Sequence, residues 1–308
     1  MGTAVSTTPH PILAKPLFHA GRRRLDRTAP GTPQADFRLL EITPMTPHIG
    51  AEITGVDLAR PIGEDLAAEL RRALDEWKVI FFRDQHRFDA RAHLALAGVW
   101  GPPEPNPFFP KGDTAGVSRL AKDATAIGQE NIWHSDHSFM AAPAMGSVLR
   151  AVEVPPAGGD TMWADMGAAY DNLDPELRAR IEGLTAVHDW EPTWGSFMTP
   201  EQIAALRTVL PPVEHPVVVH HPRTGRPTLY VNEPFTTRIT GLREAESREL
   251  LHLLGLQARI PEFQVRFRWR PDSIAIWDNI ATQHYAISDY YPQRRVMERI
   301  AVAGGPLS

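Results

Sequence analysis

The sequence lacks several features that mark particular classes of protein. It contains no cysteine, which excludes disulfides and cysteine-ligated zinc sites and is compatible with a reducing cytoplasm. No run approaches the roughly 18 apolar residues of a membrane-spanning helix, and no apolar signal core precedes a cleavage site near the N-terminus. The formal net charge of −5 leaves no basic footprint for nucleic acid. We therefore expect a cytoplasmic protein that binds neither membranes nor nucleic acid.

The chain is long enough for one large domain with a sizeable core. Residues 1–36 hold several prolines, small polar residues and the run Arg22-Arg23-Arg24. We expect this part to be a flexible N-terminal extension whose arginines are solvated rather than bound to an anion or a partner. Residues 37–308 are expected to form a single domain. The 29 prolines spread through the chain favour a loop-rich β fold over a helical bundle.

Local patterns predict individual helices and strands. Apolar residues recur at helical spacing within 63–77, and the next apolar run, 79–82, is typical of a buried strand. A capping residue followed by proline, as at Asp174 and Thr199, marks the start of a helix. Further helices are expected at 91–99 and 242–254, and strands at 265–270, 273–277 and 295–302.

Two histidines and one aspartate form a candidate metal site. His134 and Asp136 are two residues apart, so on an extended strand their side chains leave the same face, and His284 would come from a distant strand. Two imidazoles and a carboxylate leave coordination positions open, which is typical of oxygen-activating Fe(II) rather than structural zinc, magnesium or calcium. With 13 histidines in the chain, a His-x-Asp triplet alone is weak evidence. His137 would point to the opposite face of such a strand.

Other histidines and tryptophans have simpler interpretations. His215, His220 and His221 lie in a loop-like stretch where two of them precede proline, so we interpret them as surface or packing residues. Trp133 and Trp277 flank the candidate ligands, but large rings beside a buried strand are more often core residues than cavity residues.

Several blocks of sequence resemble the taurine dioxygenase family, which includes aryloxyalkanoate and alkylsulfate dioxygenases. The blocks are WHSDHSF, PPAGGDTMWADMGAAYDNL, HHPRTGRPTLYVNEPFTTRITGL and RWRPDSIAIWDNIATQHYAISDYYPQRRVMERI. They occur in the family's order, and the resemblance runs from Ile42 to Gly305. It implies a mainly β fold with flanking helices, namely a double-stranded β-helix or cupin-like jelly roll. It also implies an Fe(II) centre that uses 2-oxoglutarate and O₂ as co-substrates.

The resemblance also implies roles for individual residues. The two histidines and the aspartate match the family's metal ligands. Thr161 and Arg295 match the residues that bind the distal carboxylate of 2-oxoglutarate, and Arg299 matches the arginine that holds the anionic head of the substrate. An arginine suits this role because its planar fork pairs bidentately with a carboxylate. Alternatively, Arg299 is a surface or salt-bridged strand residue near Glu298 or Asp289.

The sequence departs from the taurine-using members in a loop before the metal ligands. Asn106 and Phe109 stand where those members have a histidine and a tyrosine. With Phe108, this loop indicates a larger, more apolar or aromatic substrate body, although the two phenylalanines are equally compatible with ordinary loop anchoring. Taurine is therefore not the expected substrate.

Two further departures concern the polar end of the substrate. Glu130, or Gln129 if the alignment shifts by one residue, replaces an asparagine that recognises the amine of taurine. Glu130 could pair with the ammonium of an amino-acid-like substrate. His137 follows the metal-binding aspartate where a small apolar residue is usual, which makes it a candidate substrate contact.

The sequence therefore predicts an Fe(II)/2-oxoglutarate-dependent dioxygenase that hydroxylates a small anionic organic molecule, with a carboxylate, sulfonate or sulfate group. Because Asp136 is retained, halogenation is not expected. Two alternatives stay open: the same scaffold performing desaturation or oxidative rearrangement in natural-product biosynthesis, and a catalytically silent jelly-roll binding protein. Members of the family usually form dimers or tetramers, so a homo-oligomer is expected.

Overall fold

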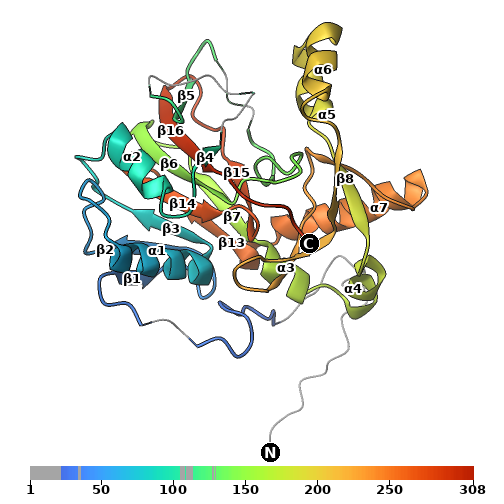
Figure 1. Cartoon of the computed structure of the whole chain (residues 1–308), viewed down its shortest axis with the longest axis horizontal. Helices are drawn as coiled ribbons and strands as arrows, with labels where there is room; N and C mark the ends of the chain where they lie inside the picture. The colour runs from blue at the N-terminus through green and yellow to red at the C-terminus, as the bar shows by residue number, and fades with distance from the viewer. Residues whose placement is uncertain (1–21, 34–35, 105–107, 109–113, 127, 129) are drawn as a thin grey trace, which may run out of the picture.

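The computed structural model describes residues 22–33, 36–104, 108, 114–126, 128 and 130–308 (Figure 1). The strands are β1 (Glu41–Pro44), β2 (Ala51–Thr54), β3 (Val79–Phe82), β4 (Pro103–Glu104), β5 (Ser118–Lys122), β6 (Gly146–Glu153), β7 (Thr161–Asp165), β8 (Thr185–His188), β9 (Val213–Pro216), β10 (Val218–His220), β11 (Pro227–Leu229), β12 (Thr236–Ile239), β13 (Gln264–Phe267), β14 (Ile274–Asp278), β15 (Thr282–Ala286) and β16 (Arg295–Val302). The helices are α1 (Glu64–Trp77), α2 (Ala90–Ala97), α3 (Met166–Asp171), α4 (Pro175–Ile181), α5 (Glu191–Trp194), α6 (Pro200–Arg207) and α7 (Glu244–Gly255), with short 3-10 turns η1 (Gly195–Phe197), η2 (Leu256–Arg259) and η3 (Pro261–Phe263).

Two sheets enclose the central core. The larger has eight strands in the order β1-β2-β3-β14-β6-β16-β4, with β5 also paired to β16, and the smaller has the order β13-β7-β15. Phe81 of the larger sheet stacks on Phe267 of the smaller one with 4.1 Å between ring centroids, and Trp163 and Trp277 pack in the same cluster. Fully buried aromatic rings of this kind bury much apolar area and hold the two sheets together. The predicted mainly β fold with flanking helices is confirmed.

Helices α1 and α2 cover the outer face of the larger sheet (Figure 1). Leu70 and Leu74 of α1 lie one turn apart and pack on Ile80 and Ile276 of the sheet. Helix α1 ends where Lys78 adopts a left-handed conformation with φ 62°, and its N–H bonds the carbonyl of Leu74. Strand β3 then begins directly.

Helices α3 and α7 pack behind the smaller sheet. Successive residues of β7 face opposite sides: Trp163 joins the core between the two sheets, whereas Ala164 joins the cluster that contains Leu250 and Leu254 of α7. Thr161 lies on the same face as Trp163, so the strand directs its hydroxyl between the sheets.

A third sheet, in the order β12-β8-β9, carries an arm made of α5, η1 and α6. The arm projects away from the sheets in Figure 1. Trp194 of the arm packs in an aromatic cluster with Trp190 and Phe235. None of the described helices is long and apolar enough to cross a membrane.

The elements with strong local signals form where the sequence predicts them. Strand 295–302 is found as β16, and helix 63–77 as α1. Asp174 accepts a hydrogen bond from the N–H of Glu176, and Thr199 forms a reciprocal capping box with Gln202. The strand expected over 265–270 ends earlier, at Phe267, because β7 pairs only as far as that residue.

Part of the N-terminal region lies against the body of the protein. The guanidinium of Arg23 lies 5.3 Å from the ring centroid of Phe263 and 3.5 Å from the carboxylate of Glu262, and its side chain is only 10% exposed. The prediction of a solvated arginine run is therefore wrong for Arg23, whose partners come from a distant segment that local sequence does not reveal. The boundary between extension and domain near residue 36 stays a prediction.

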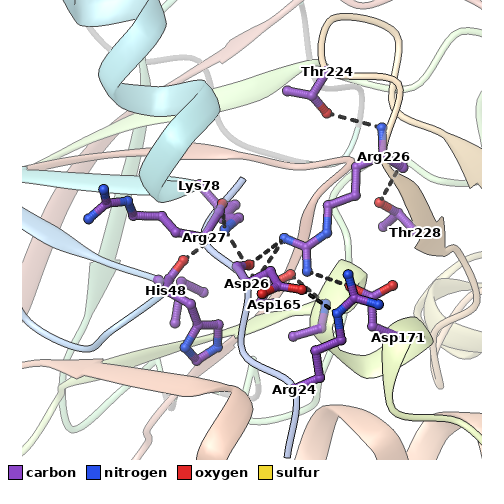
Figure 2. A network of polar contacts seen from close by, with 12 residues as sticks. Arg24, Asp26, Arg27, His48, Lys78, Asp165, Asp171, Thr224, Arg226 and Thr228 are labelled. Atoms are coloured by element: carbon purple, nitrogen blue, oxygen red, sulfur yellow. Dashed lines mark hydrogen bonds and ion pairs between the residues drawn. The ribbon is translucent and has the colours of Figure 1, made fainter. Parts of the chain in front are cut away.

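Beneath this segment lies a buried set of ion pairs, which we call the N-terminal charge network (Figure 2). The ammonium of Lys78 lies 3.3 Å from Asp165 and donates a hydrogen bond to the carbonyl of Arg27. Arg226 pairs with Asp165 at 3.5 Å and with Asp171 at 2.9 Å. The network links the end of α1, strand β7 and helix α3 to the N-terminal segment.

Candidate active site

A two-way backbone contact brings the two candidate histidine ligands together. The N–H of His134 donates to the carbonyl of His284 at 3.0 Å, and the N–H of His284 donates back at 2.8 Å. The ring centroids are 4.1 Å apart. His284 lies on β15, as the expected distant strand, but His134 forms only an isolated bridge and Asp136 lies in a turn. The prediction of an extended strand through His134 and Asp136 is therefore wrong.

The turn nevertheless directs Asp136 toward both imidazoles. Its carboxylate oxygens lie 3.7 Å from Nε2 of His134 and 3.8 Å from Nε2 of His284. Within the described part of the chain, these residues form the one group of three whose ligand atoms all lie within 4.8 Å of one another. The Nδ1 of His134 contacts the carbonyl of Ile132 at 2.8 Å. A proton on Nδ1 for this bond leaves the Nε2 lone pair facing the site.

The electrostatics favour the protonation states that bind a metal. Burial alone would raise the pKa of Asp136, but Arg299, with Nη1 3.0 Å from each carboxylate oxygen, and the neighbouring imidazoles lower this pKa far below its usual range. Burial, with a contribution from His134, lowers the pKa of His284 to about 3. An ionised carboxylate and a neutral imidazole are the forms in which these side chains bind metals. The donor set fits a divalent iron ion and contains no sulfur.

The three residues line a cavity of about 840 Å³, which we call the active-site cavity. Arg295, Met297 and Arg299 alternate along β16 and all line it, so the expected shared face of the two arginines is confirmed. Arg299 is buried but pairs with Asp136 rather than with Glu298, which instead pairs with Arg119 at 3.1 Å.

Arg295 and Thr161 form a polar end of this cavity. Arg295 is 9% exposed, and its Nε is buried without a hydrogen-bond partner among the described residues. Thr161 accepts a hydrogen bond from Nε1 of Trp269 at 2.9 Å, so its own proton remains available for a ligand. At Gly159, which has φ 70°, a Cβ atom would lie 3.2 Å from the Arg295 side chain. Glycine therefore leaves the room that this arginine occupies.

Part of the cavity wall is aromatic. Trp194, Phe197 and Phe235 line the cavity, and Phe197 is 72% exposed. Phe108 does not line the cavity but packs against Trp194, with 4.0 Å between ring centroids and the rings tilted by 30°. Its contacts therefore favour the loop-anchoring interpretation. Asn106, Phe109 and Gln129 lie outside the described residues.

The remaining candidate substrate contacts already bind protein groups. Glu130 lines the cavity and pairs with Lys122 of β5 at 2.6 Å. The Nδ1 of His137 contacts the carboxylate of Glu104 at 2.6 Å. The expectation that His137 faces away from the site is wrong, because the chain turns there with φ 56° and the side chain lines the same cavity.

The second group of histidines packs as the sequence indicates. His215 is buried and contacts the carbonyl of Met140 at 3.0 Å, while His220 is exposed. His221 is buried and bonds Asp278 at 2.9 Å. Trp133 and Trp277 are core residues, as expected, and Trp277 also lines the cavity.

Sequence reasoning missed the residue that holds Asp136 in place. The side-chain oxygen of Asn279 accepts the N–H of Asp136 at 2.7 Å. Its amide nitrogen donates to the carbonyl of Asp136 at 2.6 Å. An asparagine directly after a strand rich in buried residues is the one local signal that could have identified it.

Comparison with known proteins agrees with this geometry. The family described as "Taurine catabolism dioxygenase TauD, TfdA family" matches residues 41–301. The alkylsulfatase of Acinetobacter baylyi is 36% identical over 273 residues, covering 86% of this chain and 85% of that protein. The alpha-ketoglutarate-dependent sulfate ester dioxygenase of Pseudomonas putida is 38% identical over 273 residues, covering 86% and 90%. The solved structure of AAD-2 in complex with Mn(II) and N-oxalylglycine has a TM-score of 0.76 at 32% identity, covering 87% of this chain and 99% of that one. The chain therefore belongs to the TauD, TfdA family and is a jelly-roll dioxygenase dependent on 2-oxoglutarate (α-ketoglutarate).

Proposed function

We propose that this protein uses Fe(II), 2-oxoglutarate and O₂ to hydroxylate a small organic anion with an apolar body, and that sulfate esters are its first substrate class to test. The observation that carries the proposal is the joint lining of one cavity by a His-Asp-His ligand group, a buried arginine with a free N–H, and an aromatic wall. A catalytically silent binding protein would have no need to keep the ligand group complete.

His134, Asp136 and His284 would hold the iron. Three protein ligands leave the other positions of an octahedral ion open for a chelating co-substrate and O₂. When bound, the iron supplies the oxidation chemistry, in which one oxygen atom enters a substrate C–H bond while 2-oxoglutarate becomes succinate and CO₂. The protein contributes the geometry of the ligands and a cavity that places the substrate beside them.

Arg295 and Thr161 would bind the distal carboxylate of 2-oxoglutarate. Arg295 stays charged at neutral pH even though burial lowers its pKa, because a free guanidinium titrates far above that range. A buried N–H without a protein partner is costly, and a carboxylate acceptor would satisfy it. The hydroxyl of Thr161 would add one directional hydrogen bond.

Arg299 would orient the anionic head of the substrate beside the iron, and the aromatic wall would contact its body. Relatives of this chain are named for sulfate esters. Hydroxylation of the carbon that carries the sulfate oxygen would give an unstable product, which separates into an aldehyde and inorganic sulfate. The reaction would then release two products that can be measured separately. Dimer or tetramer formation and a cytoplasmic location stay predictions.

The first experiment adds Fe(II) and 2-oxoglutarate to the purified protein without oxygen and records the weak visible absorption band of the chelate. Linear alkyl sulfates, alkyl sulfonates, phenoxyacetate and taurine are then added with O₂, and succinate, sulfate and aldehyde are measured. We expect the band, and succinate with release of sulfate for an alkyl sulfate but not for taurine.

The variant His134→Ala serves as the control, since it removes one ligand and leaves the cavity otherwise intact. It should bind no Fe(II) and form no succinate while remaining folded. A folded wild-type protein without the chelate band would contradict the metal and co-substrate assignment. A band with no sulfate release would leave the cofactors in place and reject sulfate esters.

A further inference from the structure

The side chain of Asn279 forms a clamp on the backbone of Asp136. Its Oδ1 accepts the N–H of Asp136 at 2.7 Å, and its Nδ2 donates to the carbonyl of Asp136 at 2.6 Å and to that of Ala144 at 3.1 Å. Asn279 is 0% exposed. Both polar backbone groups of Asp136 therefore depend on a single side chain that water does not reach.

Asn279 lies in the turn between β14 and β15, and further hydrogen bonds hold this turn in place. The N–H of Asn279 donates to the carbonyl of Met145 at 2.9 Å. Asp278 accepts the N–H groups of Ile280 and Ala281 at 2.9 Å each, and the hydroxyl of Thr282 donates to the carbonyl of Asp278 at 2.6 Å. The turn leads into β15, so the residues that hold Asp136 are joined to the strand that carries His284.

Asp136 needs such support because no strand pairing fixes its backbone. It lies in a turn next to His137, whose φ of 56° is costly for a residue with a side chain. The Nη1 of Arg299 lies 3.0 Å from each carboxylate oxygen of Asp136 and competes with a metal ion for them. If the backbone of Asp136 could shift toward Arg299, its carboxylate would be less often in position to bind a metal ion together with the two imidazoles.

We propose that Asn279 is a positioning residue that sets metal affinity by holding Asp136 in ligand geometry. The proposal rests on the proposed function in assuming that His134, Asp136 and His284 bind the metal. Asn279 does not line the active-site cavity, so its effect is expected on the dissociation constant of the metal rather than on co-substrate recognition by Arg295.

A matched control lies elsewhere in the chain. The side chain of Asn172 binds the backbone of Arg24 in the same way: its Oδ1 accepts the N–H of Arg24 at 2.9 Å, and its Nδ2 donates to the carbonyls of Arg24 at 2.7 Å and Ala168 at 2.8 Å. Asn172 does not line the active-site cavity. Asn172→Ala therefore removes the same pattern of hydrogen bonds without touching the metal site.

The experiment measures the dissociation constants of Mn(II), and of Fe(II) without oxygen, by calorimetry, together with the unfolding temperature. We expect Asn279→Ala to raise the dissociation constants of both metals by about 10- to 100-fold, the usual effect of removing a group that orients a metal ligand. Asn172→Ala should lower the unfolding temperature but leave both constants unchanged.

The nearly isosteric Asn279→Asp provides the second variant should the alanine variant fail to fold. Its extra carboxylate oxygen would face the carbonyl oxygens of Asp136 and Ala144, which cannot donate, so metal binding should weaken again. Wild-type affinity in either folded variant, or equal weakening by Asn172→Ala, would overturn the inference. Failure of the wild-type protein itself to bind Mn(II) or Fe(II) would instead reject the metal assignment of the proposed function.

Discussion

Two charged cavities lie on either side of strand β14. Trp277 lines the active-site cavity of about 840 Å³, whereas the next residue, Asp278, lines a second cavity of about 380 Å³ beneath the N-terminal segment. Consecutive strand residues face opposite sides, so one strand serves both. In the second cavity, cations already have anionic partners, as Lys78 has Asp165 at 3.3 Å (Figure 2). In the active-site cavity, the Nε of Arg295 is buried with no partner among the described residues.

Under the proposed function, this difference separates charges that stabilise the fold from a charge that binds the co-substrate. Burial raises the pKa of Asp165, but Lys78 and Arg226 more than offset this and leave it below its usual value. Burial lowers the pKa of Lys78 to about 8, so the ammonium still carries its charge at neutral pH. A buried pair of this kind is costly to break because the remaining charge stays buried. By contrast, the Nε–H of Arg295 has no partner within the described residues and costs stability until a ligand satisfies it, although Tyr290 interacts with the same guanidinium.

Breaking the paired network should have the largest effect on stability. Asp165→Asn keeps the shape of the side chain and an oxygen that can accept the N–H of Ala168, but it leaves Lys78 and Arg226 without their shared anion. We expect the free energy of unfolding to fall by about 3 to 5 kcal/mol, measured by urea denaturation. The affinity for 2-oxoglutarate should not change.

The control for this variant is an exposed ion pair. Glu153→Gln removes the partner of Arg294, whose side chain is 50% exposed. It should change the free energy of unfolding by less than about 1 kcal/mol. Equal losses of unfolding free energy in Asp165→Asn and Glu153→Gln would show that the buried network contributes no more than a surface ion pair. A loss of 2-oxoglutarate binding in Asp165→Asn would show that the network also serves the active-site cavity.

Removing the charge of Arg295 should affect 2-oxoglutarate binding rather than the stability of the fold. Arg295→Leu removes a guanidinium that interacts with Tyr290 but forms no ion pair within the described residues, so the free energy of unfolding should change far less than in Asp165→Asn. A charge-assisted hydrogen bond contributes about 3 kcal/mol, so the dissociation constant of 2-oxoglutarate should rise by about 100-fold, measured by titration of the chelate band. Arg295→Lys should recover only part of the affinity, because an ammonium lacks the planar fork.

The neighbouring Arg294→Leu is the matched control. Arg294 directly precedes Arg295 in the chain but does not line the cavity, and it pairs with Glu153 on the surface. Its substitution should leave 2-oxoglutarate binding unchanged. An unchanged dissociation constant in Arg295→Leu would show that this arginine does not bind the co-substrate.

The sequence predicted the elements whose signals are local. Helix α6 begins where Thr199 and Gln202 form a capping box, and β16 places Arg295 and Arg299 on one face through the period of a strand. The three candidate metal ligands lie together as the sequence predicts, but the sequence did not predict their conformation. His134 is held by a backbone bridge to His284, which is a long-range contact that residue spacing cannot reveal.

Features that depend on partners from distant segments were missed for the same reason. Arg23 meets Phe263 and Glu262, and Asn279 meets Asp136, across long stretches of chain. A polar residue in a turn or an extension is by default solvated, so local patterns favour the wrong interpretation. Only the fold shows which of these residues are buried.

A smaller effect concerns His48, which lies beside the N-terminal charge network (Figure 2). Burial, with Lys78 and Arg226 nearby, lowers its pKa from 6.5 to about 4, although Asp165 acts in the opposite direction. Below pH 6.5, His48 therefore binds a proton in the unfolded chain but not in the folded one. The free energy of unfolding falls as the pH drops from 6.5 toward 4. The full shift corresponds to at most about 3 kcal/mol, and to about 2 kcal/mol at pH 5.

The variant His48→Leu tests this contribution. Its loss of stability between pH 6.5 and 5 should be smaller than that of the wild type, measured as the midpoint of urea unfolding at each pH. Identical pH profiles would show that His48 is not held neutral in the folded protein. The variant should bind 2-oxoglutarate as the wild type does, because His48 does not line the active-site cavity.

The smallest expected effect concerns the aromatic wall of the active-site cavity. Phe197 lines this cavity yet is 72% exposed, so a bound substrate with a long apolar body would cover it. Phe197→Ala should raise the KM for a long alkyl sulfate by about 3- to 10-fold, the range expected for the loss of a small apolar contact. The KM for a short alkyl sulfate and both kcat values should stay the same. Val209→Ala truncates another exposed apolar residue, 69% exposed and outside the cavity, and should change neither KM. If both chain lengths respond equally to Phe197→Ala, the residue acts on the arm as a whole rather than on the apolar body of the substrate.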